Sequence, residues 1–246
     1  MDMSRRPAAG DEALPGAIPL AAPQPIYRYH AYQGDTNNCG PYSVAIAANA
    51  YLGEARCDPL AVAGTMNALL FKARPLPHWV LVRLRNGPSF PWGMAAYLVE
   101  RLGVPARCRA WCPEDLLCGN LASGLITIVF IGDLLRCERG RYRGWAHAKV
   151  LYGSDPERGY AFVDPGYERD ALDPWAARGI FWQTREAFLA GWRGMLRTAI
   201  TVGVQSAEGS SGGSVAFTRP PEPLAPGRGA RPAAPGWRAT GSRWKR

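Results

Sequence analysis

Cys39 begins an apolar segment and has the setting of a cysteine nucleophile. The run CGPYSVAIAANAYL follows Asn37 and Asn38 and is closed by Gly53. A capping asparagine, a proline in the first turn and a glycine stop predict a helix from Cys39 to Leu52. Unpaired backbone N–H groups and the helix dipole favour a thiolate at that end, and the thiolate attacks carbonyl carbons. A single cysteine at a helix start is also a common buried residue, so a second signal is needed.

Gly40 and Gln33 supply part of that signal. Gly40 keeps side-chain bulk away from the sulfur, so a substrate carbonyl can approach, and we predict that Gly40 lines the substrate site. Gln33 lies six residues before Cys39. Its side-chain amide can be a second donor to an oxyanion, beside a backbone N–H of the helix start. The alternative is that Cys39 is a small buried residue and Gln33 a surface residue.

His147 is the predicted base. The chain has three histidines, and His30 and His78 are interpreted as structural. The stretch GWAHAKVLYGSDPERGYAFVDPG reads as a β-hairpin with its loop at 154–157, and this register places Asp164 directly opposite His147. Side chains so paired interact, with Cβ atoms about 4.5–5.5 Å apart. The carboxylate would fix one tautomer of the imidazole while the other nitrogen faces the thiol. Alternatively, Asp164 only starts a turn.

Two features flank the base. Trp145, two residues before His147, is predicted to form a wall of the substrate site. The basic segment from Arg136 to Arg143, RCERGRYR, is predicted to be a solvated hairpin turn, and attraction of acidic substrate residues is the alternative.

The remaining cysteines do not indicate a metal site. Cys108, Cys112, Cys118 and Cys137 lack the paired C-x2-C spacing of structural zinc sites. We interpret them as buried thiols and predict neither a metal nor another cofactor.

The elements that must position these residues are of both kinds. Apolar periodicity changes from a helical to a strand pattern near residue 125. The expected helices are 39–52, 58–71, 91–102, a short one after Pro113, and 185–193; the expected strands are 125–132, 146–153, 159–166, 179–184 and 195–204. A helix-rich N-terminal part and an antiparallel sheet in the C-terminal part predict an α+β protein.

Composition divides the chain into three parts. Residues 1–25 are rich in Ala and Pro and are expected to be a flexible lead-in, and 26–204 to be one catalytic domain. The Pro/Gly/Arg-rich segment 205–246 holds seven Lys or Arg and two Glu, out of a formal net charge of +9 for the chain. This tail is predicted to be disordered and to contact an acidic partner if it binds anything, with nucleic acid not favoured.

The start of the chain does not resemble a secretory signal. Asp11, Glu12, Pro15 and Pro19 interrupt the stretch after the first arginines, so no continuous apolar region forms. No run of about 18 apolar residues predicts a spanning helix. We therefore expect a cytoplasmic protein with reduced cysteines and no membrane insertion.

These residues resemble the papain-like cysteine peptidases, and among them the group of bacteriocin-processing, double-glycine leader peptidases, family 39 of clan CA. The resemblance covers about residues 26–203. It is carried by Gln33, by Cys39-Gly40-Pro41, by His147, by Asp164-Pro165 and by EAFLAGW at 186–192, which is similar to a helix that follows the His and Asp strands in that group.

The resemblance implies a two-lobed papain-like fold and cleavage of peptide or isopeptide bonds in a peptide or protein substrate. In such a site His147 takes the proton of Cys39, Asp164 orients His147, and Gln33 with the Cys39 N–H holds the oxyanion of a thioester pathway. Two alternatives stay open at this point. One is acyl or γ-glutamyl transfer on the same site, and the other is a catalytically idle module that binds peptides.

Overall fold

The computed structural model describes residues 18–204, except positions 68, 73–77, 86 and 135. The predicted basic tail 205–246 and the first 17 residues of the predicted lead-in lie outside the described residues. The expected lead-in boundary at 25 is wrong. Strand β1 (Leu20–Ala21) pairs with residues 153–154 of the main sheet, and Ala22 donates its N–H to the Tyr152 carbonyl oxygen. This part of the presumed lead-in is therefore part of the folded domain.

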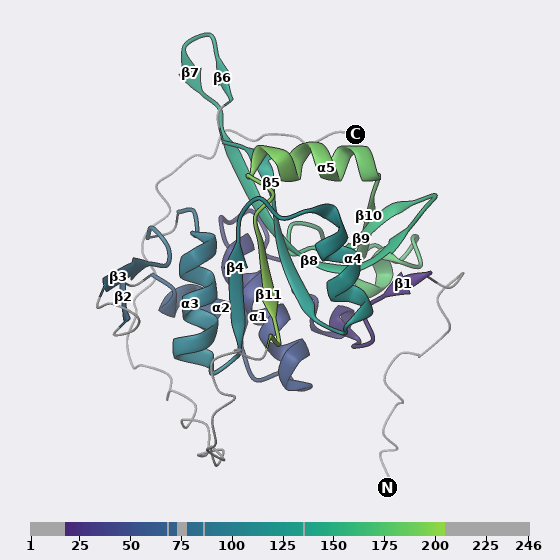
Figure 1. Cartoon of the computed structure of the whole chain (residues 1–246), viewed down its shortest axis with the longest axis horizontal. Coiled ribbons are helices and arrows are strands. Elements are labelled where there is room, and N and C mark those ends of the chain that lie inside the picture. The colour runs from purple at the N-terminus through teal and green to yellow at the C-terminus, as the bar shows by residue number, and fades with distance from the viewer. Residues whose placement is uncertain (1–17, 68, 73–77, 86, 135, 205–246) are drawn as a thin grey trace, which may run out of the picture. The chain divides into compact units, whose positions relative to one another are not determined.

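A seven-stranded antiparallel sheet forms the centre of the domain (Figure 1). Its path runs β10-β9-β8-β5-β11-β4, with β1 added on β8. The strands are β4 (Ala106–Arg109), β5 (Ile126–Asp133), β8 (Trp145–Asp155), β9 (Gly159–Val163), β10 (Ile180–Gln183) and β11 (Ala199–Val202). Most residues of β5, β8, β9 and β11 are buried, because helices cover both faces of the sheet.

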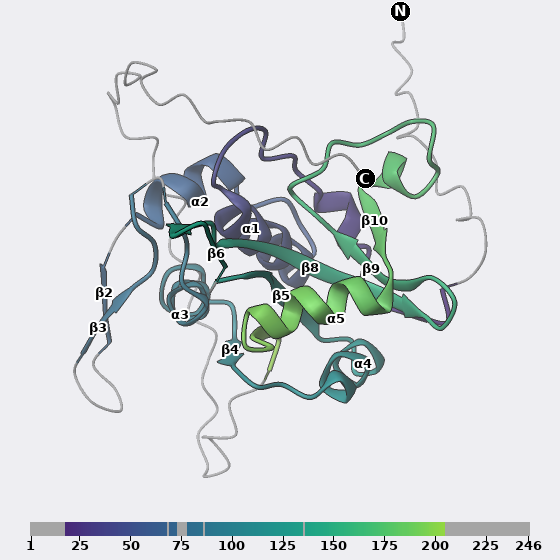
Figure 2. The same ribbon diagram turned by 90° about the horizontal axis from the view of Figure 1, so that it is seen from above.

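The helices are α1 (Cys39–Leu52), α2 (Pro59–Thr65), α3 (Pro91–Leu102), α4 (Glu114–Ala122) and α5 (Arg185–Gly194), with 3₁₀ turns η1 (Ile26–Tyr29) and η2 (Ala176–Arg178). Figure 2 shows α1 and α5 on opposite sides of β5 and β8. The α+β architecture and the bounds expected for the 39–52 and 91–102 helices are confirmed. No helix of the described residues has the length and apolar character needed to cross a membrane.

Helix α1 is the most deeply packed helix around the site. Its residues from Val44 to Ala48 are fully buried, and their small or branched side chains let the helix lie close to the sheet. The Ser43 hydroxyl donates to the Ala148 carbonyl oxygen at 3.0 Å, which ties α1 to β8. This contact places the amino end of α1 beside the amino-terminal part of β8, where His147 lies.

The prediction of a helix over residues 58–71 is correct for its first half and wrong for the rest. It ends at Thr65, where the Thr65 hydroxyl donates to the Ala61 and Val62 carbonyl oxygens. Such bonds compete with helix continuation. The rest of the segment forms β2 (Leu69–Lys72), which pairs with β3 (His78–Leu81).

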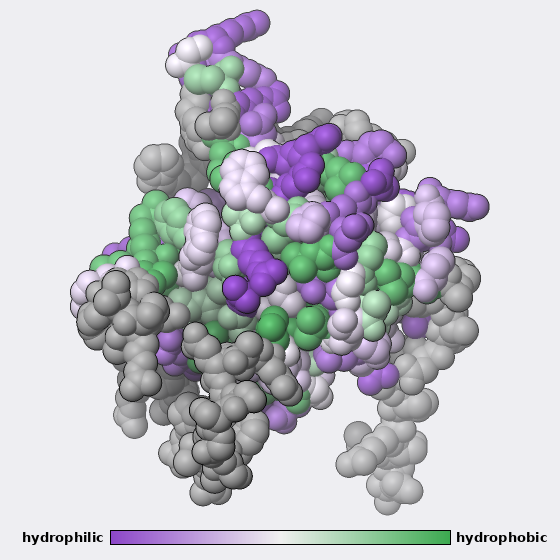
Figure 3. Space-filling model, viewed as in Figure 1, coloured by the Kyte–Doolittle hydropathy of each residue, from purple (hydrophilic) through white to green (hydrophobic). Residues whose placement is uncertain are grey.

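A second small hairpin extends the β5–β8 ribbon. Strands β6 (Cys137–Glu138) and β7 (Arg141–Tyr142) pair with each other and project from the body of the domain, where hydrophilic side chains are exposed (Figure 3). The expectation of a hairpin in this basic segment is confirmed.

Candidate active site

Cys39 is the first residue of α1, and its side chain is partly exposed. The expected asparagine cap is only partly correct. Asn38 occupies the cap position, but its side chain makes no capping bond to the helix. Its Oδ1 instead accepts a bond of 2.7 Å from the Arg83 guanidinium. Pro41 has no N–H, and Tyr42 N–H bonds to the Asn38 carbonyl oxygen, so the first-turn amides of Cys39 and Gly40 are not bonded by the cap side chain.

The hairpin register expected for His147 is wrong. The turn comprises 156–158 rather than 154–157, because Asp155 Oδ1 accepts the N–H groups of Glu157 and Arg158. A bulge between Leu151 and Gly153 shifts the pairing again, and Val150 then lies opposite Val163. Continued along the strands, this register places Gly166, not Asp164, opposite His147.

Asp164 nevertheless contacts His147. It directly follows β9 and turns back, so that its Oδ1 lies 2.5 Å from His147 Nε2. The same oxygen accepts the Gly166 N–H at 2.8 Å. A side chain on Gly166 would lie 2.9 Å from the imidazole Cε1, so glycine is needed to let the turn approach the ring. Asp164 is 1% exposed, which makes this pairing strong because water does not compete for it.

Cys39 is hydrogen-bonded to His147. Since Nε2 faces Asp164, we assign this bond to Nδ1. Burial opposes ionisation of the thiol, but the bond to His147, its charge, and the N–H groups of Ala148 and Gly40 together lower the pKa of Cys39 below its usual value. Burial would likewise lower the pKa of His147, but Asp164 and then Cys39 raise it to about 10. The two shifts together favour a thiolate beside an imidazolium.

Gln33 is held next to the Asp164 turn. Its backbone N–H donates to the Pro165 carbonyl oxygen at 2.9 Å, and its Nε2 donates to the Thr36 carbonyl oxygen at 2.8 Å. The Gln33 Oε1 is buried without a partner among the described residues. One N–H of the side-chain amide is thus engaged within the loop and the second is left for another acceptor. The predicted contact of Gln33 with an oxyanion stays a prediction.

Gly40 and Trp145, both predicted to line the substrate site, lie in different surroundings. Gly40 is buried, and a Cβ there would lie 2.5 Å from Ser89 Oγ and 3.3 Å from Met94 Sδ, so packing explains why this residue is glycine. Trp145 begins β8, opposite Asp133, and is partly buried against the core. Its side chain lies on the same face of β8 as that of His147, because the two residues are two positions apart in the strand. Contact of either residue with a substrate stays a prediction.

Sequence reasoning missed two residues that support Asp164. His30 Nε2 lies 3.0 Å from the Asp164 carbonyl oxygen and 3.1 Å from that of Tyr167, so it helps to fix the turn from Asp164 to Tyr167. Lys149 is 4% exposed, and its Nζ lies 4.0 Å from Asp164 Oδ2 and 3.8 Å from the centre of the Phe162 ring. Burial, only partly offset by Asp164, lowers the pKa of Lys149 to about 8. Lys149 lies two positions after His147 in the same strand, so the two side chains are on the same face, and this spacing could have identified Lys149 from the sequence.

The other shifted thiols differ from Cys39. Burial raises the pKa of Cys57, Cys108 and Cys112, to about 12 at Cys108. Reactivity is therefore expected at Cys39 rather than at these three. Among the described residues no group of three or more His, Cys, Asp or Glu side chains is placed to hold a metal ion.

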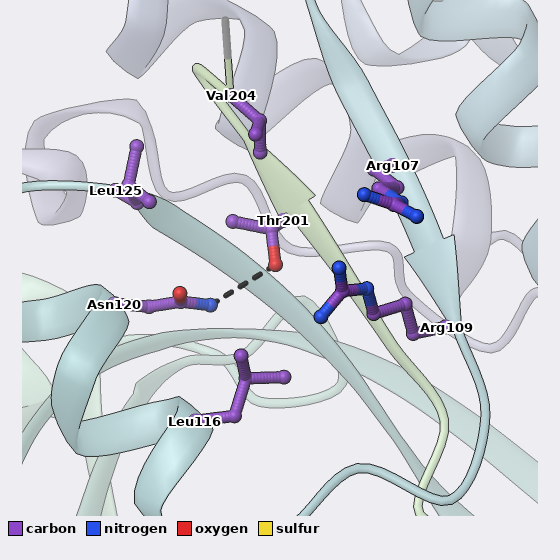
Figure 4. A pocket seen from close by; sticks show the side chains of 7 residues that line it. All are labelled: Arg107, Arg109, Leu116, Asn120, Leu125, Thr201 and Val204. Carbon is purple, nitrogen blue, oxygen red and sulfur yellow. Dashed lines mark hydrogen bonds between the residues drawn. The ribbon is translucent and has the colours of Figure 1, made fainter. Parts of the chain in front are cut away.

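Two hollows on the described surface lie away from Cys39. One of about 690 Å³ is lined by Glu138, Arg139, Arg141 and Arg143 of the β6–β7 hairpin. The other, of about 100 Å³, lies between α4, β4 and β11 (Figure 4), where Asn120 donates to Thr201 Oγ1 at 3.0 Å. Neither includes a residue of the Cys39–His147–Asp164 chain, so the case for an active site rests on side-chain chemistry.

Comparisons with known proteins support the fold. No protein-family model matches the chain, and no curated protein matches it. The chain is similar in structure to one titled "Crystal structure of an putative C39-like peptidase from Bacillus anthracis", with a TM-score of 0.50 and 15% sequence identity over 77% of this chain and 98% of that one. This likeness is a distant, fold-level one. The mixed helical and antiparallel-sheet architecture is consistent with a C39-like peptidase fold.

Proposed function

We propose that this protein is a papain-like cysteine peptidase that cleaves peptide or isopeptide bonds through a Cys39 thioester. The observation that carries the proposal is the chain of contacts from the Cys39 sulfur through His147 to Asp164, with Nε2 and Oδ1 2.5 Å apart. A nucleophile, a base and a group that orients the base are the components that covalent acyl transfer needs. The distant likeness to a C39-like peptidase structure supports the same reaction class.

The reaction begins from the thiolate–imidazolium pair. The Cys39 sulfur attacks the carbonyl carbon of the scissile amide, and the carbonyl oxygen becomes an oxyanion. His147 then gives its Nδ1 proton to the amide nitrogen as the C–N bond breaks, and the amine leaves. Water enters, His147 removes its proton, and the resulting attack on the thioester releases the acid and restores the Cys39 thiolate.

Oxyanion stabilisation is assigned to the start of α1 and to Gln33. The Cys39 backbone N–H lies in a first turn that no side chain caps, and the helix dipole adds partial positive charge there. The second N–H of the Gln33 amide is the other donor in this proposal. Each donor of this kind is worth about 10²–10³-fold in kcat where it has been removed from other enzymes.

The experiment compares wild type with Cys39→Ala on a mixture of unstructured peptides. New peptide termini and the covalent acyl-enzyme mass after acid quenching are measured by mass spectrometry. Cys57→Ala is the matched control, since burial raises the pKa of that cysteine. The proposal expects cleavage by wild type and by the control, with a loss of roughly 10³-fold or more in Cys39→Ala.

Adding hydroxylamine separates hydrolysis from transfer. A peptidase forms mostly free acid in water, whereas a transferase forms hydroxamate in strong excess over acid. If wild type gives neither new termini nor an acyl-enzyme, the peptidase proposal is wrong. Binding of peptides without turnover would then favour the idle-module alternative.

A further inference from the structure

Arg83 is a buried cation beside the start of α1. It is 3% exposed. Its guanidinium donates to the carbonyl oxygens of Gly87 at 3.0 Å, Asn37 at 3.0 Å and Ala63 at 3.4 Å, and to Asn38 Oδ1 at 2.7 Å. All four acceptors are uncharged. None of the ion pairs found among the described residues includes Arg83, so its charge is not balanced by a carboxylate there.

A buried arginine without a carboxylate is costly, because its charge is desolvated. Burial lowers the pKa of Arg83, and the group that acts in the opposite direction is the Cys39 sulfur. An anionic sulfur at Cys39 would therefore stabilise Arg83, and by reciprocity Arg83 would stabilise the thiolate. Arginine keeps its charge at every accessible pH, so this effect does not titrate away as the charge of His147 does.

The bond from Arg83 to Asn38 also affects the helix. An asparagine at the cap position normally accepts the N–H of the second or third helical residue. Here the third residue is Pro41, which has no N–H, and Arg83 occupies the Asn38 oxygen. The amide at Gly40 is then free to donate toward the Cys39 sulfur, as it does. Two further bonds from Arg83, to Asn37 and Gly87, fix the position of this loop.

We propose that Arg83 is a positioning residue of the active site, which holds Asn38 away from the first turn of α1 and places a permanent positive charge beside the Cys39 thiolate. This inference rests on the proposed function. It adds a cation beside the Cys39 sulfur, in addition to His147, and assigns a role to a loop residue 44 positions after the nucleophile.

The test measures the pH midpoint of Cys39 alkylation by iodoacetamide, read by peptide mass spectrometry. Arg83→Gln removes the charge, and its midpoint is expected to rise by about one pH unit, as for loss of a nearby charge in a partly buried site. Arg83→Lys keeps the charge but loses the fork that binds Asn37 and Asn38 together. Its midpoint is expected to stay near wild type while kcat falls several-fold. Arg101→Gln, at an exposed arginine of α3, is the control and should match wild type in both.

A merely structural role would change stability without moving the midpoint. If Arg83→Gln is folded by circular dichroism and its midpoint equals that of wild type, the inference is overturned. If Arg83→Gln does not fold, Arg83→Lys decides: a midpoint raised by about one pH unit contradicts the role of the charge. An unchanged midpoint with an unchanged kcat contradicts the positioning role, and an unchanged midpoint with a reduced kcat supports it. Absence of low-pH labelling in wild type would instead contradict the proposed function itself, so the two failures are distinguishable.

Discussion

Replacing Cys39 by alanine is expected to expose a pH dependence of the free energy of unfolding that comes from His147. Asp164 keeps His147 protonated in the folded chain at pH values where an unfolded histidine is neutral. Burial alone would lower the pKa of His147, but Asp164 and Cys39 raise it to about 10, whereas an unfolded histidine titrates near 6.5. Above about pH 6.5 the folded chain thus keeps a proton that the unfolded chain releases. The stabilisation is complete below the unfolded pKa and is lost as the pH rises toward 10, by about 1.4 kcal/mol per pH unit.

In the wild type Cys39 acts in the opposite direction. Its pKa is lowered, because His147 outweighs the effect of burial. In the proposed thiolate–imidazolium pair the folded chain lacks a thiol proton that the unfolded chain keeps up to about pH 8.5. The stabilising contribution of Cys39 therefore rises with pH. The two slopes cancel, so this pair adds no pH dependence to the free energy of unfolding of the wild type from about pH 6.5 to 8. Lys149, whose pKa burial lowers to about 8, titrates near the upper end of this range in wild type and in variants that keep its surroundings, so each variant is compared with wild type.

Cys39→Ala keeps the slope of His147 but loses the opposing slope of Cys39. Over about 1.5 pH units this variant should lose about 2 kcal/mol of unfolding free energy relative to wild type. Urea unfolding at about pH 6.5 to 8, followed by the fluorescence of the nine tryptophans, measures the difference. In the control, Cys39→Ala combined with Asp164→Asn, the loss of stability with rising pH that is due to His147 should disappear. Equal slopes in wild type and Cys39→Ala would refute this reasoning.

Three further changes test other contacts of the site. Asp164→Asn removes the charge that raises the pKa of His147, so the alkaline limb of the activity profile should move at least about one pH unit lower; an unchanged limb would contradict the role of that charge. Gly40→Ala should cost about 1–3 kcal/mol of unfolding free energy because its Cβ would overlap Ser89, and Ser89→Gly should restore part of it; no loss in thermal or urea unfolding would contradict the packing. Lys149→Met should move the acid limb of activity to higher pH, since the buried ammonium helps keep Asp164 ionised; an identical acid limb would show that Lys149 does not act on Asp164.

The helix that carries Cys39 could be predicted from local sequence. Pro41 near its start and Gly53 at its stop determine the bounds with little help from the rest of the fold. The role of Asn38 could not be predicted in the same way. Its side-chain oxygen is bound by Arg83, a residue that tertiary folding brings from a distant loop, and no spacing in the sequence indicates that contact.

The contact of His147 with Asp164 was expected for a reason that is wrong. Symmetric pairing around a 154–157 loop does not occur, because Asp155 binds the N–H groups of Glu157 and Arg158 and so shifts the turn. A bulge after Leu151 then alters the register. The contact forms because Asp164 leaves the strand and turns back toward the imidazole. Asx turns and bulges depend on single side chains and on sheet twist, which alternation of apolar residues does not reveal.

The central claim is that Cys39 is a thiolate held by protonated His147 near neutral pH. The most direct measurement is the rate of iodoacetamide alkylation of Cys39 between about pH 5 and 7 in wild type and in His147→Ala. The claim predicts fast alkylation of the wild type below pH 7, well before an ordinary thiol with a pKa near 8.5 reacts, and its loss in His147→Ala. A wild-type rate that rises only above about pH 8, or one that His147→Ala leaves unchanged, would contradict it.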